Sequence, residues 1–183
     1  MKVLAFAASN SRRSINRQLV SYAASQLEGA EIEILDLNDY EMPLFSEDRE
    51  AELGQPEQAR ALLDKIANSD ALMISYAEHN GSYSAAYKNI FDWTSRIQHK
   101  VFQNKPMVLL ATSPGAGGAA NVLAAATTSA PYFDGDVRAS LSVPRFYDNF
   151  DVEQGRLIND ELNDQLIRAI NSLAATPDAQ EVA

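Results

Sequence analysis

The chain of 183 residues has the composition of a single globular domain, with 46% apolar and 22% charged residues. It contains no cysteine, which excludes a disulfide framework, a thiolate zinc site and a cysteine nucleophile, and its two histidines exclude a multi-histidine metal centre. The formal net charge of −10 argues against nonspecific binding to nucleic acid.

Short apolar runs alternate with segments of helical periodicity along the chain. Five strands are predicted, over residues 2–8, 31–37, 70–76, 106–112 and 137–143. Five helices are predicted, over residues 14–27, 56–68, 82–98, 118–129 and 160–174. Residues 40–55 are expected to form a long loop. Residues 176–183 are expected to be a frayed tail after one domain that spans residues 1–175.

This alternation predicts an α/β fold, a single doubly wound, five-stranded parallel sheet that helices cover on both faces. No segment resembles a signal peptide or a membrane span, so a cytoplasmic protein without a membrane partner is expected. Ligands of such sheets bind beyond the carboxyl ends of the strands. The loops after the first, third and fourth strands are therefore the expected functional site.

The charge is unevenly distributed. Residues 28–64 carry 12 acids and two arginines, which is typical of a solvated face. Residues 1–27 contain four basic residues and no acid. This basic island predicts that a small anionic ligand binds near the N-terminus.

The first loop, residues 9–16, reads Ser-Asn-Ser-Arg-Arg-Ser-Ile-Asn and opens a helix. A helix N-terminus offers unpaired N–H groups, and three hydroxyls with two arginines exceed what a single N-cap requires. The loop therefore predicts phosphate binding, although it lacks the triphosphate-binding Gly-Lys motif. The alternative is an ordinary cap formed by Ser11 or Ser14.

The second loop, residues 76–82, contains Asn80-Gly81, which favours a tight turn with positive φ. The exposed peptide groups of such a turn can reach the edge of a flat heterocycle. The alternative is a plain turn followed by a helix that Ser82 caps.

The third loop, residues 112–120, contains Gly115, Gly117 and Ala120 at the spacing of a dinucleotide-binding fingerprint. That fingerprint belongs after the first strand of a sheet, so we reject this interpretation. The glycines are better explained by close approach of the backbone to a planar ligand, with Ser113 adding a hydroxyl. The alternative is a flexible loop without a ligand.

Taken together, the three loops resemble those of the NAD(P)H-dependent FMN reductase family, which includes quinone, azo and chromate reductases. The matching segments are residues 9–19, residues 78–82 with 88–93, and residues 113–118, and the likeness covers residues 2–172. The chain departs from the usual family motif at Ser11, Ala77 and His79, where the family has Arg, Pro and Tyr.

The resemblance implies a flavodoxin-like flavoprotein that binds FMN. The first loop would hold the FMN phosphate through Ser9, Ser11, Arg12, Ser14 and Asn16, with Ile15 also in contact with the cofactor. The isoalloxazine ring would be bordered by Ala77, Glu78, His79, Asn80 and Gly81 on one side and by Ser113, Gly115, Gly117 and Gly118 on the other.

In such an enzyme FMN accepts hydride from NADPH or NADH and passes electrons to a small acceptor, namely a quinone, a flavin, an azo compound or a metal oxyanion. No catalytic side chain and no metal are therefore expected. The basic island favours NADPH over NADH, with Arg13 and Arg17 as candidates for the 2′-phosphate. The alternatives are a flavodoxin-like electron carrier and a flavin-free binding protein of the same fold.

The aromatic residues of the third predicted helix suggest an assembly. Tyr83, Tyr87 and Phe91 form one stripe that can cover the sheet, whereas Tyr76, Trp93 and Phe102 need not lie on it. Aromatic side chains are enriched at interfaces. Together with the resemblance, this predicts a homodimer or homotetramer with the flavin near the interface. The alternative is that Trp93 packs in the monomer core.

Overall fold

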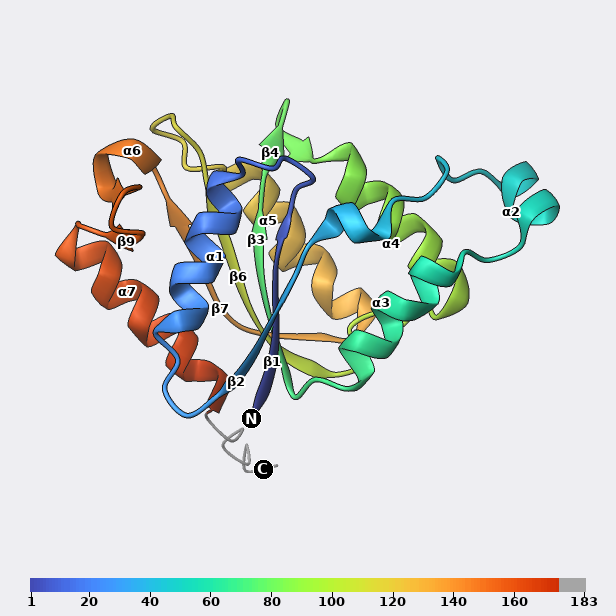
Figure 1. The fold of residues 1–183 in the computed structure, drawn as a ribbon, viewed down its shortest axis with the longest axis horizontal. Helices are drawn as coiled ribbons and strands as arrows, with labels where there is room; N and C mark the ends of the chain where they lie inside the picture. Colours follow the sequence, from blue (N-terminus) through green and yellow to red (C-terminus); the bar gives the residue numbers. More distant parts are fainter. Residues whose placement is uncertain (175–183) are drawn as a thin grey trace, which may run out of the picture.

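A five-stranded, all-parallel sheet forms the centre of the protein (Figure 1). The computed structural model describes residues 1–174; the predicted tail lies outside the described residues. The strands are β1 (Lys2–Ala8), β2 (Glu31–Leu35), β3 (Ala71–Tyr76), β6 (Lys105–Thr112) and β7 (Gly135–Val143). Their order is β2-β1-β3-β6-β7, so the strand order reverses between β1 and β3. The predicted doubly wound, flavodoxin-like sheet is confirmed.

The three central strands end level with one another. Ala8 at the end of β1 pairs in register with Tyr76 of β3, and Tyr76 pairs with Ala111 of β6. These strands are apolar along nearly their whole length because helices cover both of their faces. The level ends bring the loops that follow the three strands to one edge of the sheet.

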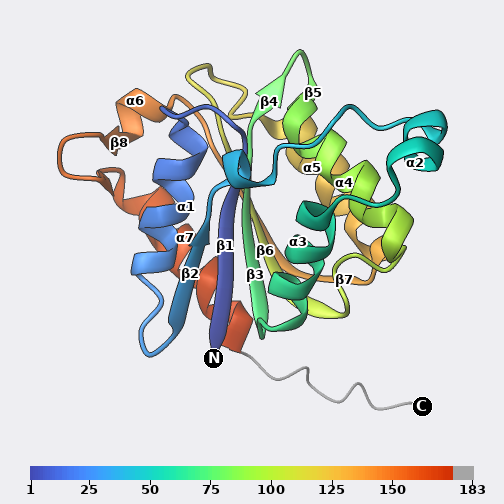
Figure 2. The ribbon, with the colours of Figure 1, turned by 45° about the vertical axis from the view of Figure 1, so that its right-hand side comes forward.

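Helices cover the sheet on both faces (Figure 2). One face is covered by α1 (Ile15–Ser25) and α7 (Asp160–Asn171), and the other by α3 (Glu57–Ala67), α4 (Ala85–Ile97) and α5 (Ala120–Ser129). Each face has its own apolar core, because neighbouring residues on a strand point to opposite sides. In β1, for example, Leu4 and Phe6 lie in one core, whereas Val3 and Ala5 lie in the other.

Several small elements lie outside this framework. They are the helices α2 (Glu47–Leu53) and α6 (Phe146–Asn149), the hairpin strands β4 (Glu78–His79), β5 (Ser82–Tyr83), β8 (Phe150–Asp151) and β9 (Arg156–Leu157), and the 3₁₀ turns η1 (Leu37–Tyr40), η2 (Ala130–Phe133) and η3 (Ser172–Ala174). In Figure 2, α2 projects from the body of the protein. No helix among residues 1–174 is long and apolar enough to cross a membrane.

Two predictions of local structure are wrong. Residues 40–55 are not loop throughout, because they contain α2, which Ser46 caps and which buries none of its residues. A helix without a buried face leaves no apolar periodicity in the sequence. The helix expected from Ser82 begins at Ala85, because Ser84 rather than Ser82 forms its N-cap. The Ser84 hydroxyl also donates to the Ala8 carbonyl oxygen at 2.8 Å, which fixes α4 to β1.

The expectation that Tyr76, Trp93 and Phe102 supply interface surface is also wrong. All three are buried within the monomer, and the Trp93 side chain is 0% exposed. The Trp93 indole N–H donates to the Pro43 carbonyl oxygen at 2.7 Å, and its ring packs edge-on against Phe45. The alternative, that Trp93 belongs to the core, is confirmed.

Candidate functional site

A cavity of about 280 Å³ lies at the edge of the sheet where β1, β3 and β6 end. It brings together the three loops that were predicted from the sequence to form the functional site. Its lining consists of Ser9, Ser11, Arg13, Ser14, Ile15, Asn16, Ala77, Glu78, His79, Thr112, Ser113, Pro114 and Tyr147. The position matches the rule that ligands of such sheets bind at the point where the strand order reverses.

Ser9 and Ser14 keep hydroxyl protons available to a ligand. The Ser14 oxygen accepts the Arg17 N–H at 3.2 Å as the N-cap of α1, and the Ser9 oxygen accepts the Ser11 N–H at 3.2 Å. In each bond the hydroxyl acts as the acceptor, so its own proton can still be donated. The first turn of a helix also leaves backbone N–H groups without intrahelical acceptors. The site therefore offers several neutral donors at the positive end of a helix dipole.

Asn16 is a positioning residue. Its buried side chain donates to the Thr112 carbonyl oxygen at 3.1 Å and accepts the Thr112 N–H at 3.0 Å. The same amide oxygen accepts the Ser75 hydroxyl at 2.8 Å. Asn16 thus fixes the start of α1 to the ends of β3 and β6. Its amide oxygen is fully used by the protein, which assigns it to the shape of the loop.

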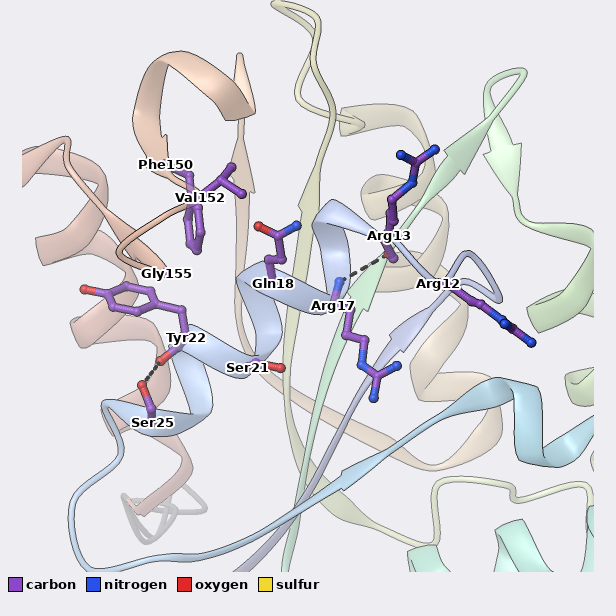
Figure 3. A pocket seen from close by; sticks show the side chains of 11 residues that line it. Arg12, Arg13, Arg17, Gln18, Ser21, Tyr22, Ser25, Phe150, Val152 and Gly155 are labelled. Carbon is purple, nitrogen blue, oxygen red and sulfur yellow. Dashed lines mark hydrogen bonds between the residues drawn. The ribbon is translucent and has the colours of Figure 1, made fainter.

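The three arginines of this region differ in their surroundings (Figure 3). Arg13 lines the cavity and also an adjoining surface groove of about 540 Å³ along α1, whereas Arg12 lines only the groove. In Figure 3 the Arg12 side chain points away from Val152 on the opposite wall. Arg17 forms an ion pair with Asp36, so its charge is compensated.

The basic island is therefore less basic in the fold than in the sequence. Besides the Arg17 pair, Lys2 lies 3.3 Å from a Glu33 carboxylate oxygen. The Asn38 N–H and the Arg17 guanidinium hold the pKa of Asp36 below its usual range. Among residues 1–174, Arg12 and Arg13 form no ion pair, which leaves these two guanidinium groups for an anionic ligand.

Glu78 joins the second and third loops. One of its carboxylate oxygens accepts the Val122 N–H at 2.9 Å, and the other lies 3.3 Å from the Asn121 side-chain nitrogen. These groups belong to the first turn of α5, whose own N-cap, Ala119, has no capping side chain. A carboxylate thus already occupies the N-terminus of α5. This explains physically why the glycines before α5 are not a pyrophosphate-binding fingerprint.

The turn of the β4–β5 hairpin has the expected geometry. Asn80 and Gly81 have φ values of 53° and 78°, which is typical of a two-residue hairpin turn. Both residues lie at the exposed tip and outside the cavity lining, whereas Ala77 and His79 line the cavity. The hairpin therefore faces the cavity with its first strand, β4, and with the residue before it.

The glycines of the third loop serve different purposes. Gly118 has a φ of 58°, and a Cβ there would collide with the Ser142 hydroxyl and lie 3.0 Å from the Pro144 nitrogen. Gly118 is thus required by packing against the end of β7. A Cβ on Gly115 or Gly117 would meet open space, at most touching Ser113 at 4.0 Å. The protein itself does not require glycine at these two positions, and neither they nor Gly118 line the cavity.

Three lining residues were not predicted from the sequence. Thr112 and Pro114 flank Ser113 within the third predicted loop, and their place in that loop was the available signal. Tyr147 comes from α6, a segment for which no structure was predicted, and its side chain is 62% exposed. Backbone bonds from Arg145 to Gly115 at 2.9 Å and from Phe146 to Ser113 at 3.1 Å hold α6 beside this loop. Such a contact cannot be read from local sequence.

The family model for the NADPH-dependent FMN reductases matches residues 1–144. The chain belongs to this family. The 2-hydroxy-1,4-benzoquinone reductase of Burkholderia is 34% identical over 121 residues, which are 66% of this chain and 64% of that protein. The NAD(P)H-dependent FMN reductase of Pseudomonas aeruginosa is 29% identical over 147 residues, covering 79% of this chain and 77% of that protein.

A solved structure agrees with these sequence matches. FerB, a flavoenzyme NAD(P)H:(acceptor) oxidoreductase from Paracoccus denitrificans, superposes with a TM-score of 0.73 at 25% identity and covers 94% of each chain. The predicted family and fold are confirmed. Members of the family use FMN with NAD(P)H as electron donor.

The cavity fits the phosphate end of FMN. A phosphate requires several convergent donors, and this edge of the sheet offers free hydroxyl protons on Ser9 and Ser14, the first turn of α1 and the unpaired Arg13. No acidic residue lies in the first turn of α1 to oppose an anion.

Proposed function

We propose that the protein is an NAD(P)H-dependent oxidoreductase that binds FMN in this cavity and reduces a small acceptor. The observation that carries the proposal is the meeting of the three predicted loops around one cavity, beside the hydroxyl and N–H donors at the N-terminus of α1. Ser9, Ser14 and Arg13 are the proposed phosphate ligands. Ser11 and Ile15, which also line the cavity, would complete the same end of the site.

The isoalloxazine ring is proposed to lie between the second and third loops. Ala77 and His79 would border it from β4, and Ser113 from the end of β6. The open space at Gly115 and Gly117 allows backbone to approach the ring from the same side. Glu78 and Asn16 contribute indirectly, because they fix these loops to α5 and to α1.

Bound FMN supplies the redox chemistry by accepting hydride from a nicotinamide and passing electrons on. The residues of this chain then have three tasks: they bind the phosphate, orient the ring and leave one ring face open to the two substrates in turn. None of these tasks needs a general acid, a general base or a nucleophile, so no catalytic side chain is proposed.

NADPH is the proposed donor. Arg12 and Arg13 lie along the groove that adjoins the cavity, and no carboxylate among the described residues neutralises them. A 2′-phosphate adds charge that guanidinium groups bind well. Arg17 is no longer a candidate, because it is paired with Asp36.

Three further points stay predictions. They are the acceptor, which is a quinone, a flavin, an azo compound or a metal oxyanion; the assembly, which is a homodimer or homotetramer; and the cytoplasmic location. Tyr132 and Tyr147 are now the aromatic candidates for a subunit interface, because they are 71% and 62% exposed, whereas the aromatic residues first expected there are buried. A mass of about twice the 20.0 kDa chain in light scattering would support a dimer, and the mass of one chain would contradict it.

An absorption spectrum tests the function directly. The purified protein, loaded with FMN and freed of excess flavin, should show a bound-flavin spectrum that NADPH bleaches and that a quinone restores. Tight FMN binding without bleaching would favour an electron carrier. Absence of any FMN binding would favour a flavin-free protein of the same fold and overturn the proposal.

A further inference from the structure

A second cavity, of about 290 Å³, lies between α4 and α5 on the face of the sheet opposite α1. Six aromatic rings form most of its lining, namely Tyr76, Tyr83, Tyr87, Phe91, Phe102 and Phe133. It shares no lining residue with the proposed flavin cavity. The two cavities are therefore separate sites, although neighbouring residues of one strand end, Tyr76 and Ala77, contribute to each.

Several rings of the lining pack against one another edge to face. The ring centroids of Phe91 and Phe133 are 4.7 Å apart and nearly perpendicular, and those of Tyr76 and Tyr87 are 5.3 Å apart in an edge-to-face arrangement. Aromatic faces and edges prefer such offset and perpendicular contacts with a further ring. Ligand pockets of this size commonly combine apolar walls with a few polar groups.

The hydrogen bonds of the lining tyrosines are unequal. The Tyr83 hydroxyl lies 3.2 Å from the Ser129 hydroxyl, which in turn donates to the Ala126 carbonyl oxygen at 3.3 Å. In this series of hydrogen bonds, the hydroxyl protons of Tyr83 and Ser129 both have an acceptor. The Tyr76 and Tyr87 hydroxyls lie 3.4 Å apart and, among residues 1–174, have only each other as partners. One proton can lie between them, so the other has no acceptor.

Both phenols keep their protons. Burial raises the pKa of Tyr76 and of Tyr87 well above the usual value for a tyrosine. The unpaired donor is thus permanent, and a buried donor without an acceptor is unfavourable. A carbonyl oxygen brought by a ligand would satisfy it.

We propose that this cavity binds a flat aromatic molecule that carries a carbonyl oxygen, and that the Tyr76–Tyr87 pair donates the hydrogen bond to that oxygen. The six rings recognise the flat apolar body, and the spare phenolic proton recognises the carbonyl group. This site lies apart from the proposed flavin cavity, and its occupancy does not depend on FMN.

The test uses FMN-loaded protein and two probes of similar shape, coumarin, which has a carbonyl oxygen, and naphthalene, which has none. Binding is measured by ligand-observed NMR titration. The wild type should bind coumarin more tightly than naphthalene. The Tyr76→Phe/Tyr87→Phe variant should lose about 3- to 10-fold in coumarin affinity, as expected for one neutral hydrogen bond, and keep its naphthalene affinity. Both hydroxyls are removed because either one alone would remain a free donor.

Two controls locate the site. Tyr83→Phe alters a lining hydroxyl that already has a partner, so it should leave the preference for coumarin unchanged. Ala125→Trp, at an exposed position on the α5 wall, should abolish binding of both probes without changing FMN content. Thermal unfolding of each variant confirms that the fold is retained.

Three outcomes would overturn the proposal. They are the absence of coumarin binding to the wild type, an equal coumarin affinity in the double variant, and binding that Ala125→Trp does not affect. If light scattering shows a dimer that Ala125→Trp dissociates while coumarin does not bind, a second copy of the chain covers this face instead.

Discussion

The helices α1 and α5 both begin at the edge of the sheet that forms the candidate site, yet their N-termini differ. That of α1 is capped by Ser14, has no acidic residue in its first turn and lies beside the unpaired Arg13. That of α5 has no cap of its own and receives the carboxylate of Glu78 from another loop. A helix N-terminus can bind an anionic ligand only where the protein has not already supplied an anion. This difference favours the hydroxyl-rich loop over the glycine-rich loop as the proposed phosphate site.

The largest expected effect tests the α1 side of this comparison. Arg13→Ala together with Ser14→Ala should weaken FMN binding by at least about 100-fold, because charged hydrogen bonds contribute roughly 1.5–3 kcal/mol each. Fluorescence titration of flavin measures the affinity, and unfolding curves confirm that the variant is folded, since losing the cap costs about 1 kcal/mol. Arg12→Ala is the matched control and should bind FMN normally. An equal loss of FMN affinity in Arg12→Ala would indicate that Arg12, and not Arg13, binds the phosphate.

The glycines before α5 provide the next test. Gly118→Ala should lower the free energy of unfolding by about 2–3 kcal/mol, because the left-handed backbone and the contact with Pro144 both resist a Cβ. Gly117→Ala, which meets open space, should leave stability within about 0.5 kcal/mol of the wild type. Chemical denaturation measures both. A weaker affinity for FMN in Gly117→Ala would then indicate close approach by the ring. Similar stability losses in the two variants would contradict this division of roles.

Removing the carboxylate at α5 should have a smaller effect. Glu78→Ala should lower the free energy of unfolding by about 1–2 kcal/mol, since the first turn of α5 loses its only cap among the described residues. Glu52→Ala is a suitable control, because Glu52 is exposed on α2 and no ion pair involves it among residues 1–174. Unchanged stability of Glu78→Ala would show that α5 does not depend on this cap.

The surface groove along α1, where NADPH is proposed to bind, predicts a smaller effect that is selective for one nucleotide. Arg12→Ala should raise the KM for NADPH about 5-fold while leaving the KM for NADH unchanged, because an exposed ion pair contributes no more than about 1 kcal/mol. Steady-state kinetics with both nucleotides at two ionic strengths measures this. Arg49→Ala on the projecting α2 is the control. Equal changes for NADH and NADPH would argue against 2′-phosphate recognition by Arg12.

The smallest effect concerns the arginine that the fold neutralises. The pKa of Asp36 is lowered in the folded state, so its contribution to stability is present above the unfolded pKa of about 4 and is lost as the pH falls through the folded value. Because the pair is partly exposed, the contribution should be below about 1 kcal/mol. Asp36→Asn should therefore flatten the acid limb of stability between about pH 5 and 2 in denaturation curves. If the stability of Asp36→Asn falls with acid as steeply as that of the wild type, this prediction is contradicted.

Much of the fold follows from local sequence. The strands β1, β3 and β6 are short apolar runs because both of their faces are buried, and such runs are recognisable without any partner. The alternation of strands and helices then fixes a parallel sheet, and the level strand ends place the three loops at one edge. The hydroxyls of residues 9–14 were equally visible, since they are contiguous in the chain.

Only the tertiary structure decided which of these groups remain free. Asn16 is used by Thr112, 96 residues away, Arg17 is neutralised by Asp36, and Glu78 caps a helix that begins 42 residues later. Periodicity shows which face of a helix is apolar but not what covers it, so Trp93 lies under Phe45 instead of at an interface. Hydrogen bonds and ion pairs across such distances depend on how the loops meet. The sequence therefore predicts where the site lies better than it predicts the role of each residue in the site.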